Sequence, residues 1–156
     1  LEHDTVRNYL VVTDTGKRKV TLNDMRVGSV VGEMRQPYSD QLLMPVDVAI
    51  DDMSRTYVTD AAKGCIHIYD KNGDFIKLFG KGELRKPWGI CFDRQDNLLV
   101  SDEGSNRILM YTAAGKLNRV ITEDVYLPKG ISVNIHERLA ITTGDPYNFL
   151  KIIQYK

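Results

Sequence analysis

The chain has 156 residues, of which 42% are hydrophobic and 27% are charged, the composition of an ordinary globular domain. Its 21 basic and 21 acidic residues give a formal net charge of zero. This balance excludes a polybasic tail and a chain-wide positive field for nucleic acid, but it allows a local basic patch. No apolar run is long enough to span a membrane, and the N-terminus lacks the basic start and apolar core of a signal peptide.

Short apolar runs separated by turn residues indicate β-structure throughout the chain. One group of four runs covers residues 46–50, 56–59, 65–69 and 75–79, and the next covers residues 89–92, 98–100, 108–111 and 117–121. Asn72-Gly73 lies between two of these runs and is a strong hairpin signal, because both residues tolerate positive φ. No segment shows the sustained 3.6-residue apolar period of a helix. We therefore predict antiparallel strands joined by turns.

Cys65 and Cys91, the only two cysteines, both fall within predicted strands. Two cysteines make neither a disulfide framework nor a four-ligand zinc site. We predict that both are reduced and structural, and that Cys91 is buried in its apolar run and unreactive. A reducing, cytoplasmic setting is the corresponding expectation.

Two sequence markers repeat in phase, with a period of about 42 residues. A Thr or Ser followed by Asp recurs, and a proline opens a short apolar segment in each period. The dipeptides are Thr13-Asp14, Thr59-Asp60, Ser101-Asp102 and a degenerate Thr142-Thr143, and the prolines are Pro45, Pro87 and Pro128. Four antiparallel strands per period of this length are typical of a β-propeller blade. We expect each Asp to cap the turn after a blade's second strand rather than to serve as a metal ligand or catalytic group.

The repeating unit resembles the NHL repeat. The motif reads Pro87-Trp88-Gly89-Ile90, then Asp93 to Asp102, then Asn106-Arg107-Ile108. The resemblance implies an all-β fold, an NHL-type β-propeller of four-stranded antiparallel blades. About four blades are expected here, as part of a six-bladed ring, at approximately residues 1–34, 45–80, 87–122 and 128–156, the last without its outer strand. The sequence departs from the pattern at Asp47, where the family prefers Gly, and at Thr143, where the Asp is lost.

The final segment, residues 150–155, resembles the C-termini of tripartite-motif NHL proteins of the Brat-like group. The resemblance implies a propeller that is itself non-catalytic and needs no cofactor. It also implies a longer protein in which a RING, a B-box and a coiled coil precede the propeller, as in RING-type ubiquitin ligases. Missing N-terminal blades, or a second copy of the chain, would then close the ring.

The sequence gives little support for a catalytic function. The histidines are His3, His67 and His136, and they form no metal-binding motif. Some enzymes with NHL-like propellers use histidine and metal at the central channel, but this histidine content disfavours a propeller lyase. The serines and cysteines lack a nucleophile motif.

The most informative positions lie in loops that a propeller places on one face. These loops cover residues 32–45, 80–88 and 122–129, together with residues 15–19, 61–64, 103–107 and 144–148. They carry a modest excess of basic residues with interleaved aromatics, whereas the opposite loops are slightly acidic. The densest cluster comprises Lys81, Arg85, Lys86 and Trp88. The candidate RNA- or partner-binding residues are Lys17, Arg18, Arg35, Lys63, Lys81, Arg85, Lys86, Trp88, Arg107, Lys129 and Tyr147.

Two functions follow from this face. Cations that neutralise phosphates and rings that stack on bases suit single-stranded RNA, and Brat-like NHL domains bind it on this face. Other tripartite-motif NHL domains bind proteins, so the alternative is a platform that recruits substrates to a ubiquitin ligase. Exposed lysines and arginines also act simply as solubilising residues, and Trp88 could pack between blades. The near-zero net charge favours the protein platform, and the basic segment 81–88 favours RNA.

Overall fold

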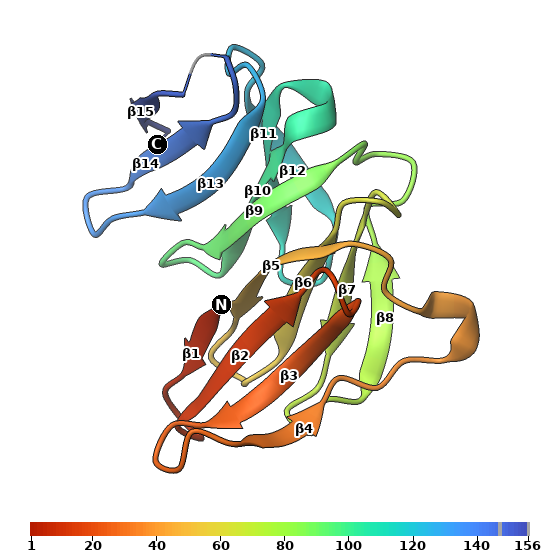
Figure 1. The fold of residues 1–156 in the computed structure, drawn as a ribbon. Coiled ribbons are helices and arrows are strands. Elements are labelled where there is room, and N and C mark those ends of the chain that lie inside the picture. Colours follow the sequence, from red (N-terminus) through yellow and green to blue (C-terminus); the bar gives the residue numbers. More distant parts are fainter. Residues whose placement is uncertain (147, 156) are drawn as a thin grey trace.

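The computed structural model describes residues 1–146 and 148–155, and these fold into antiparallel sheets that follow one another along the chain (Figure 1). Blade 1 consists of β1 (Glu2–Asp4), β2 (Tyr9–Asp14), β3 (Lys19–Asp24) and β4 (Val30–Glu33), and blade 2 of β5 (Pro45–Ile50), β6 (Thr56–Asp60), β7 (Cys65–Tyr69) and β8 (Phe75–Phe79). Blade 3 consists of β9 (Pro87–Phe92), β10 (Asn97–Asp102), β11 (Arg107–Thr112) and β12 (Leu117–Thr122), and blade 4 of β13 (Pro128–Val133), β14 (Arg138–Thr143) and β15 (Leu150–Gln154).

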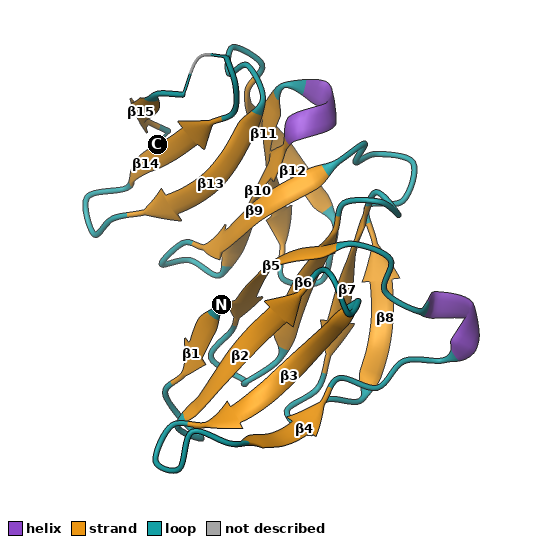
Figure 2. Ribbon diagram, viewed as in Figure 1, coloured by secondary structure: helices purple, strands orange, loops and turns teal. Residues whose placement is uncertain are grey.

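This arrangement confirms the predicted all-β propeller. Within each blade, every strand pairs with the next in sequence, and in blade 4 the sheet has three strands. The three prolines are the first residues of β5, β9 and β13, and the predicted hairpin joins β7 to β8 with Gly73 at φ 82°. Sequence analysis did not predict two short 3-10 helices, η1 (Tyr38–Asp40) and η2 (Glu103–Ser105) (Figure 2). No helix in the described part of the chain is long and apolar enough to cross a membrane.

The first strands of the four blades face a common axis. Side chains from β1, β5, β9 and β13, among them Glu2, Ile50, Cys91 and Ser132, line one cavity of about 310 Å³. The prediction that Cys91 is buried is therefore wrong in part, because the residue is only half-buried at the wall of this channel. Burial of its thiol still raises the pKa of Cys91 to about 12, so the thiolate is scarce at neutral pH. Cys65 is fully buried.

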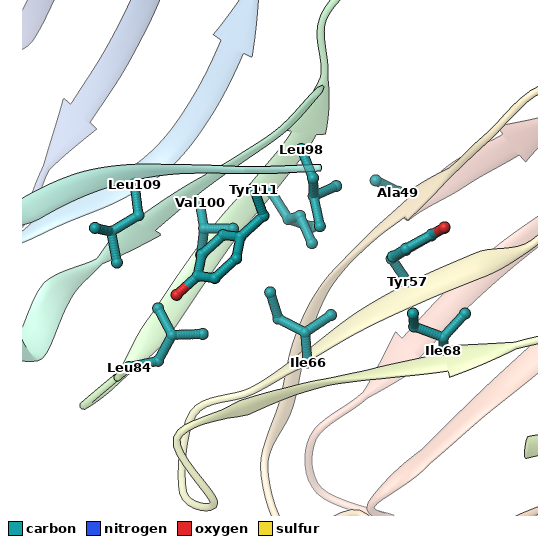
Figure 3. Close-up of a cluster of buried hydrophobic side chains, with 10 residues drawn as sticks. Ala49, Tyr57, Ile66, Ile68, Leu84, Leu98, Val100, Leu109 and Tyr111 are labelled. Atoms are coloured by element: carbon teal, nitrogen blue, oxygen red, sulfur yellow. The ribbon is translucent and has the colours of Figure 1, made fainter. Parts of the chain in front are cut away.

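The hydrophobic core lies between blades rather than within them. Figure 3 shows the cluster at the boundary of blades 2 and 3, where Tyr57 and Ile66 meet Leu98, Val100 and Tyr111. Similar clusters fill the boundaries of blades 1 and 2 and of blades 3 and 4. Within the described residues, no such cluster joins blade 4 to blade 1. Each sheet therefore depends on its neighbours to cover its apolar faces.

The hydroxyl of the repeated Thr/Ser-Asp dipeptide links consecutive blades. Thr13 Oγ1 donates to the carbonyl oxygen of Val46 at 3.0 Å, and Thr59 Oγ1 donates to that of Trp88 at 2.7 Å. Ser101 Oγ donates to the carbonyl of Lys129 and accepts a hydrogen bond from the Gly89 amide. The acceptor is in each case the residue after the proline position, on the first strand of the next blade.

The aspartate of the dipeptide anchors the incoming linker. Asp60 accepts hydrogen bonds from the amides of Leu43 and Met44 at 2.8 and 3.1 Å. The predicted turn-capping role is confirmed for Asp14 and Asp60, which accept the amides of residues 17 and 63. Asp102 differs, because the backbone amides that its carboxylate accepts are those of linker residues 85 and 86, while η2 forms the following turn.

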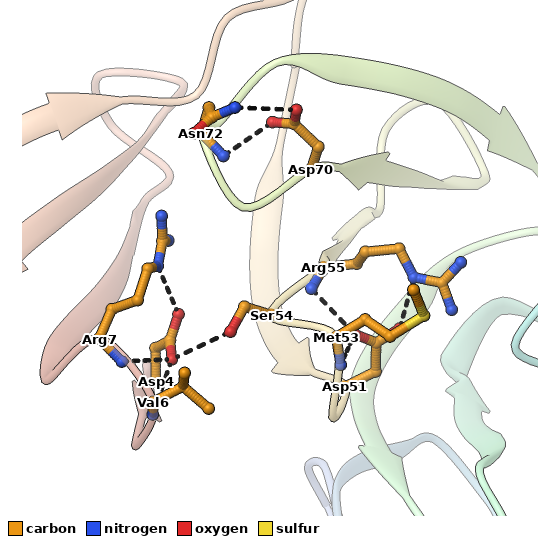
Figure 4. Close-up of polar contacts among 9 residues, drawn as sticks. All are labelled: Asp4, Val6, Arg7, Asp51, Met53, Ser54, Arg55, Asp70 and Asn72. Atoms are coloured by element: carbon orange, nitrogen blue, oxygen red, sulfur yellow. Dashed lines mark hydrogen bonds and ion pairs between the residues drawn. The ribbon is translucent and has the colours of Figure 1, made fainter.

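A second set of carboxylates orders the turns on the opposite face (Figure 4). Asp4 and Asp51 each accept the amide two residues ahead, at 3.1 and 3.0 Å, and Asp93 does the same at 2.9 Å. Ser54 in the turn of blade 2 also donates to Asp4 in blade 1 at 3.3 Å. These acidic side chains therefore order the local backbone of the turns on the opposite face.

His67 is a buried polar residue in the core near the boundary of blades 1 and 2. Its side chain is fully buried, and its Nε2 has no hydrogen-bond partner and lies 3.9 Å from the Asp60 carboxylate. Its Nδ1 lies 3.5 Å from the Tyr69 hydroxyl. Burial outweighs the nearby carboxylate and lowers the pKa of His67 from 6.5 to about 4, so the imidazole is neutral in the folded protein.

Replacing Ser101 with Ala should destabilise the fold. The change leaves the buried Gly89 amide without an acceptor, which costs about 1–3 kcal/mol. Thr142→Ala is the matched control, because Thr142 accepts the Gly130 amide in the same way but at an exposed position, where water can replace it. Urea unfolding should show a clear loss for Ser101→Ala and a change below about 0.5 kcal/mol for Thr142→Ala. Equal losses in the two variants would contradict the assigned cost of leaving the buried Gly89 amide without an acceptor.

His67 should make the fold sensitive to acid. Because the folded-state pKa is depressed, the contribution of His67 is complete above pH 6.5 and is lost as the pH falls toward 4. Roughly 2 kcal/mol should disappear between pH 7.5 and pH 5. Urea unfolding of His67→Met, which cannot titrate, should show a correspondingly flatter pH dependence, whereas His136→Gln at an exposed turn should behave like the unaltered chain. A slope that His67→Met leaves unchanged would refute this assignment.

Candidate functional site

The linkers between blades and the turns between second and third strands share one face of the molecule. We call this the loop face; it comprises residues 15–18, 34–44, 61–64, 80–86, 103–106 and 123–127, the described part of residues 144–149, and the adjoining strand ends that carry Trp88, Arg107 and Lys129. The bonds from Asp60 and Asp102 to the linker amides hold the two kinds of loop together. At the next boundary, the Gly144 amide donates to the carbonyl of Leu127 at 2.9 Å. The loop face is therefore a direct consequence of the repeat.

The clearest cluster on this face surrounds Trp88. The Nζ atoms of Lys86 and Lys129 lie 5.1 and 4.7 Å from the centroid of its ring, within cation–π distance. Trp88 and Lys129 follow the prolines that open β9 and β13, so they occupy equivalent positions in adjacent blades. Gly89 permits this approach, since a Cβ there would lie only 2.3 Å from the carbonyl oxygen of Lys129. The half-buried indole belongs to this cationic cluster rather than to the apolar cores.

Glu103, which sequence analysis did not select, completes the cluster. Its Oε2 lies 2.5 Å from the Nζ of Lys86, and its Oε1 lies 4.0 Å from the Nζ of Lys129. The Glu103 side chain is only 9% exposed, because η2 holds it against the linker and its amide donates to the carbonyl of Lys86 at 3.0 Å. A sequence signal existed, since this acid directly follows Ser101-Asp102, where the other copies have Thr15, Ala61 and Gly144.

Arg85 and Arg107 line a separate cavity of about 310 Å³, together with Glu83 and two leucines of β11 and β12. Arg85 is exposed, and only its backbone is fixed, through the amide that Asp102 accepts. Arg107 lies 3.5 Å from the Asp102 carboxylate and donates to the carbonyl of Glu83, while its buried Nε has no partner. Two guanidinium groups at one cavity can bind an anion such as a phosphate.

Lys17 and Arg18 line a third cavity, of about 320 Å³, with the side chains of the first linker. Both are exposed, and Arg18 adopts a left-handed conformation at φ 56° that closes the turn. Lys63 is half-buried and Lys81 is exposed, and both lie close enough to Cys65 to act on its thiol electrostatically. The loop face therefore carries basic side chains at each blade boundary.

Two of the predicted site residues do not join these clusters. The Arg35 Nε pairs with Asp74 Oδ1 at 2.8 Å, in the hairpin between β7 and β8, which belongs to the opposite loops. Its charge is thus already neutralised and lies away from Trp88. Tyr147 lies outside the described residues.

The chemistry of the loop face is that of binding. Ammonium and guanidinium groups attract anions, and the half-buried indole offers a planar surface for stacking. Among the described residues, no three His, Cys, Asp or Glu side chains are grouped to hold a metal ion.

The comparisons with known proteins agree with the repeat and the fold. Residues 84–111 match the NHL repeat model. The segment that contains β9, β10 and most of β11 is an NHL repeat. The chain is 33% identical over 150 residues to the human E3 ubiquitin-protein ligase NHLRC1, covering 86% of this chain and 38% of that protein. It is also 39% identical over 61 residues to protein lin-41 of Caenorhabditis elegans, covering 39% of this chain and 5% of that protein. The NHL propeller thus spans well under half the length of these relatives.

Solved structures also resemble this propeller, at low sequence identity and over nearly the whole chain. The chain matches one from a nidogen/laminin complex with a TM-score of 0.80 and 18% identity, covering 97% of this chain and 62% of that one. It matches virginiamycin B lyase from Staphylococcus aureus with a TM-score of 0.70 and 17% identity, covering 95% of this chain and 53% of that one. At such identities the likeness shows the propeller fold alone. The NHL match and the likeness to NHLRC1 identify this propeller as a binding module.

Proposed function

We propose that the loop face of this NHL propeller binds single-stranded RNA and serves post-transcriptional regulation. The observation that carries the proposal is the cluster of Lys86, Trp88 and Lys129, in which two cations meet an accessible indole. A base can stack on the indole, for about 1–3 kcal/mol, while the flanking ammonium groups neutralise phosphates. The bases of a single strand are free to be splayed over such a face, whereas those of a duplex are not.

The remaining basic residues extend this surface across the blade boundaries. The cavity of Arg85 and Arg107 can receive a phosphate beside the Trp88 cluster, and Lys17 with Arg18 offers a third contact at the first boundary. Lys63 and Lys81 add further positive charge to this surface. Tyr147 remains part of the proposed surface on sequence grounds, and Arg35 contributes least because Asp74 holds it at the hairpin between β7 and β8.

The second candidate is a protein-recruitment platform in a RING-type ubiquitin ligase. The likeness to NHLRC1, a ubiquitin-protein ligase, extends over 86% of this chain and favours it. In this reading the chain is part of a longer tripartite-motif NHL protein that acts in the cytoplasm, and the loop face contacts a protein substrate. Absence of RNA affinity in a propeller with all its blades would favour this alternative.

The outer face of blade 4 supports a larger ring in either case. Leu150 and Ile152 are 60% and 61% exposed, yet their counterparts in blade 3, Ile108 and Met110, are 0% and 2% exposed beneath blade 4. Thr142, whose counterparts donate to the next blade, is exposed as well. We propose that further blades of the same protein, completing a six-bladed ring, or a second copy of this chain cover this face.

Reversing the charge of Lys81, Arg85 and Lys86 to Glu should abolish binding of random single-stranded RNA. In the unaltered chain, the logarithm of affinity should fall by about 0.7 per neutralised phosphate for each tenfold rise in salt. Fluorescence anisotropy of a labelled RNA, titrated at several salt concentrations, measures both. The matched control reverses Lys71, Arg94 and Lys116, which are exposed on the opposite loops. Binding that survives the first reversal, or is lost equally in the control, would dismiss the loop face as the RNA site.

Association through blade 4 is tested separately with Leu150→Asp and Ile152→Asp together. Size-exclusion chromatography with light scattering should show the unaltered chain self-associating and the double variant as a monomer, since two charges at the open face oppose burial. Ile76→Asp, at an exposed position of β8, is the control and should still associate. An unaltered chain that is a monomer with a cooperative, native-like melting transition would count against the need for a covered face.

A further inference from the structure

We infer that Glu103 is a built-in competitor for anions at the Trp88 cluster, which makes this site discriminate against simple phosphates in favour of ligands that also stack. The inference rests on the proposed function and assigns a selectivity residue to it. The observation behind it is the position of one carboxylate between two lysines that come from different blades.

The geometry places Glu103 where a phosphate would bind. Its two oxygens reach the Nζ of Lys86 at 2.5 Å and that of Lys129 at 4.0 Å, and both ammonium groups lie near the Trp88 ring. The carboxylate is 9% exposed, whereas the lysine side chains are 42% and 37% exposed. The cations can therefore move toward a ligand, but the carboxylate stays beneath them.

The fold does not require this carboxylate. The structural acid of the repeat is Asp102, which holds the linker amides, and Glu103 is an addition found only in this copy. Among the described residues, the partners of its side chain are the two lysines. The backbone of Glu103, rather than its side chain, connects η2 to the linker. A neutral residue of the same shape should thus preserve the architecture.

The energetic consequence follows from burial. A phosphate that draws Lys86 and Lys129 away leaves a nearly buried carboxylate without a counter-ion, which is costly. For a bare polyanion, the two ammonium contacts alone must offset this unfavourable free energy. A nucleotide adds base stacking on Trp88, so it can bind where the bare polyanion cannot. Glu103 therefore lowers the affinity for both ligands. It also repels a ligand in proportion to the charge that the ligand brings to the site, so it opposes a multiply charged polyphosphate more strongly than the singly charged phosphodiester of a nucleotide.

The test uses the fluorescence of Trp88, the only tryptophan in the chain. Single-stranded RNA and sodium tripolyphosphate are titrated separately into the unaltered chain, Glu103→Gln and Glu123→Gln. The last is the matched control, because Glu123 is an exposed acid in a loop-face linker and its replacement changes the net charge equally. Thermal melting of each variant verifies that it is folded.

We expect Glu103→Gln to bind tripolyphosphate on the order of ten-fold more tightly than the unaltered chain, and RNA several-fold more tightly with a steeper salt dependence. Glu123→Gln should resemble the unaltered chain. Equal affinities in the unaltered chain and a folded Glu103→Gln, or an equal gain in Glu123→Gln, would overturn the inference. If no variant binds RNA but Glu103→Gln alone gains tripolyphosphate affinity, the proposed RNA function fails while the role of Glu103 as a competitor stands.

Discussion

The structure depends on the boundary between one blade and the next. A four-stranded sheet with apolar residues on both faces cannot cover either face itself, so its burial is supplied by its neighbours. At each boundary within the described residues, an apolar cluster provides the non-directional part of the free energy. The hydroxyl of the Thr/Ser-Asp dipeptide provides the directional part, because it reaches a carbonyl on the first strand of the following blade. Packing brings the sheets together, and this hydrogen bond fixes their register.

The same boundary bonds build the proposed site. Thr59 holds the carbonyl of Trp88, and Ser101 holds that of Lys129, so the backbones beneath the two side chains are fixed by the preceding blades. Close approach at Gly89 then brings the lysine over the indole. A binding surface assembled in this way belongs to no single repeat. Its side chains meet because blades 3 and 4 pack closely at that boundary. Such packing suits a binding surface that is already ordered before its ligand binds.

The charge that the loop face offers to a ligand depends on the ion pairs of its side chains, and not only on its summed formal charge. Arg35 counts as one of the basic residues of its linker, yet Asp74 neutralises it. Glu103 counts as one acid among several, yet its carboxylate forms ion pairs with two lysines. Summing formal charges over a face therefore gives the direction of its field, but the local cost of moving each cation toward a ligand depends on partners that are distant in sequence.

The sequence by itself determined the repeat, the strands, the turn residues and the propeller, because these depend on local alternation, on prolines and glycines, and on a period visible in the order of residues. It also predicted which loops share a face, since loops alternate between the two ends of antiparallel strands, although Arg35 pairs with a hairpin of the opposite loops. Only the tertiary structure decided which of them meet. Trp88 and Lys129 meet across a blade boundary, and Cys91 is half-buried because it lines the cavity between the first strands of the blades. Contacts between blades depend on side-chain reach across a curved interface, and no spacing in a single chain encodes that distance.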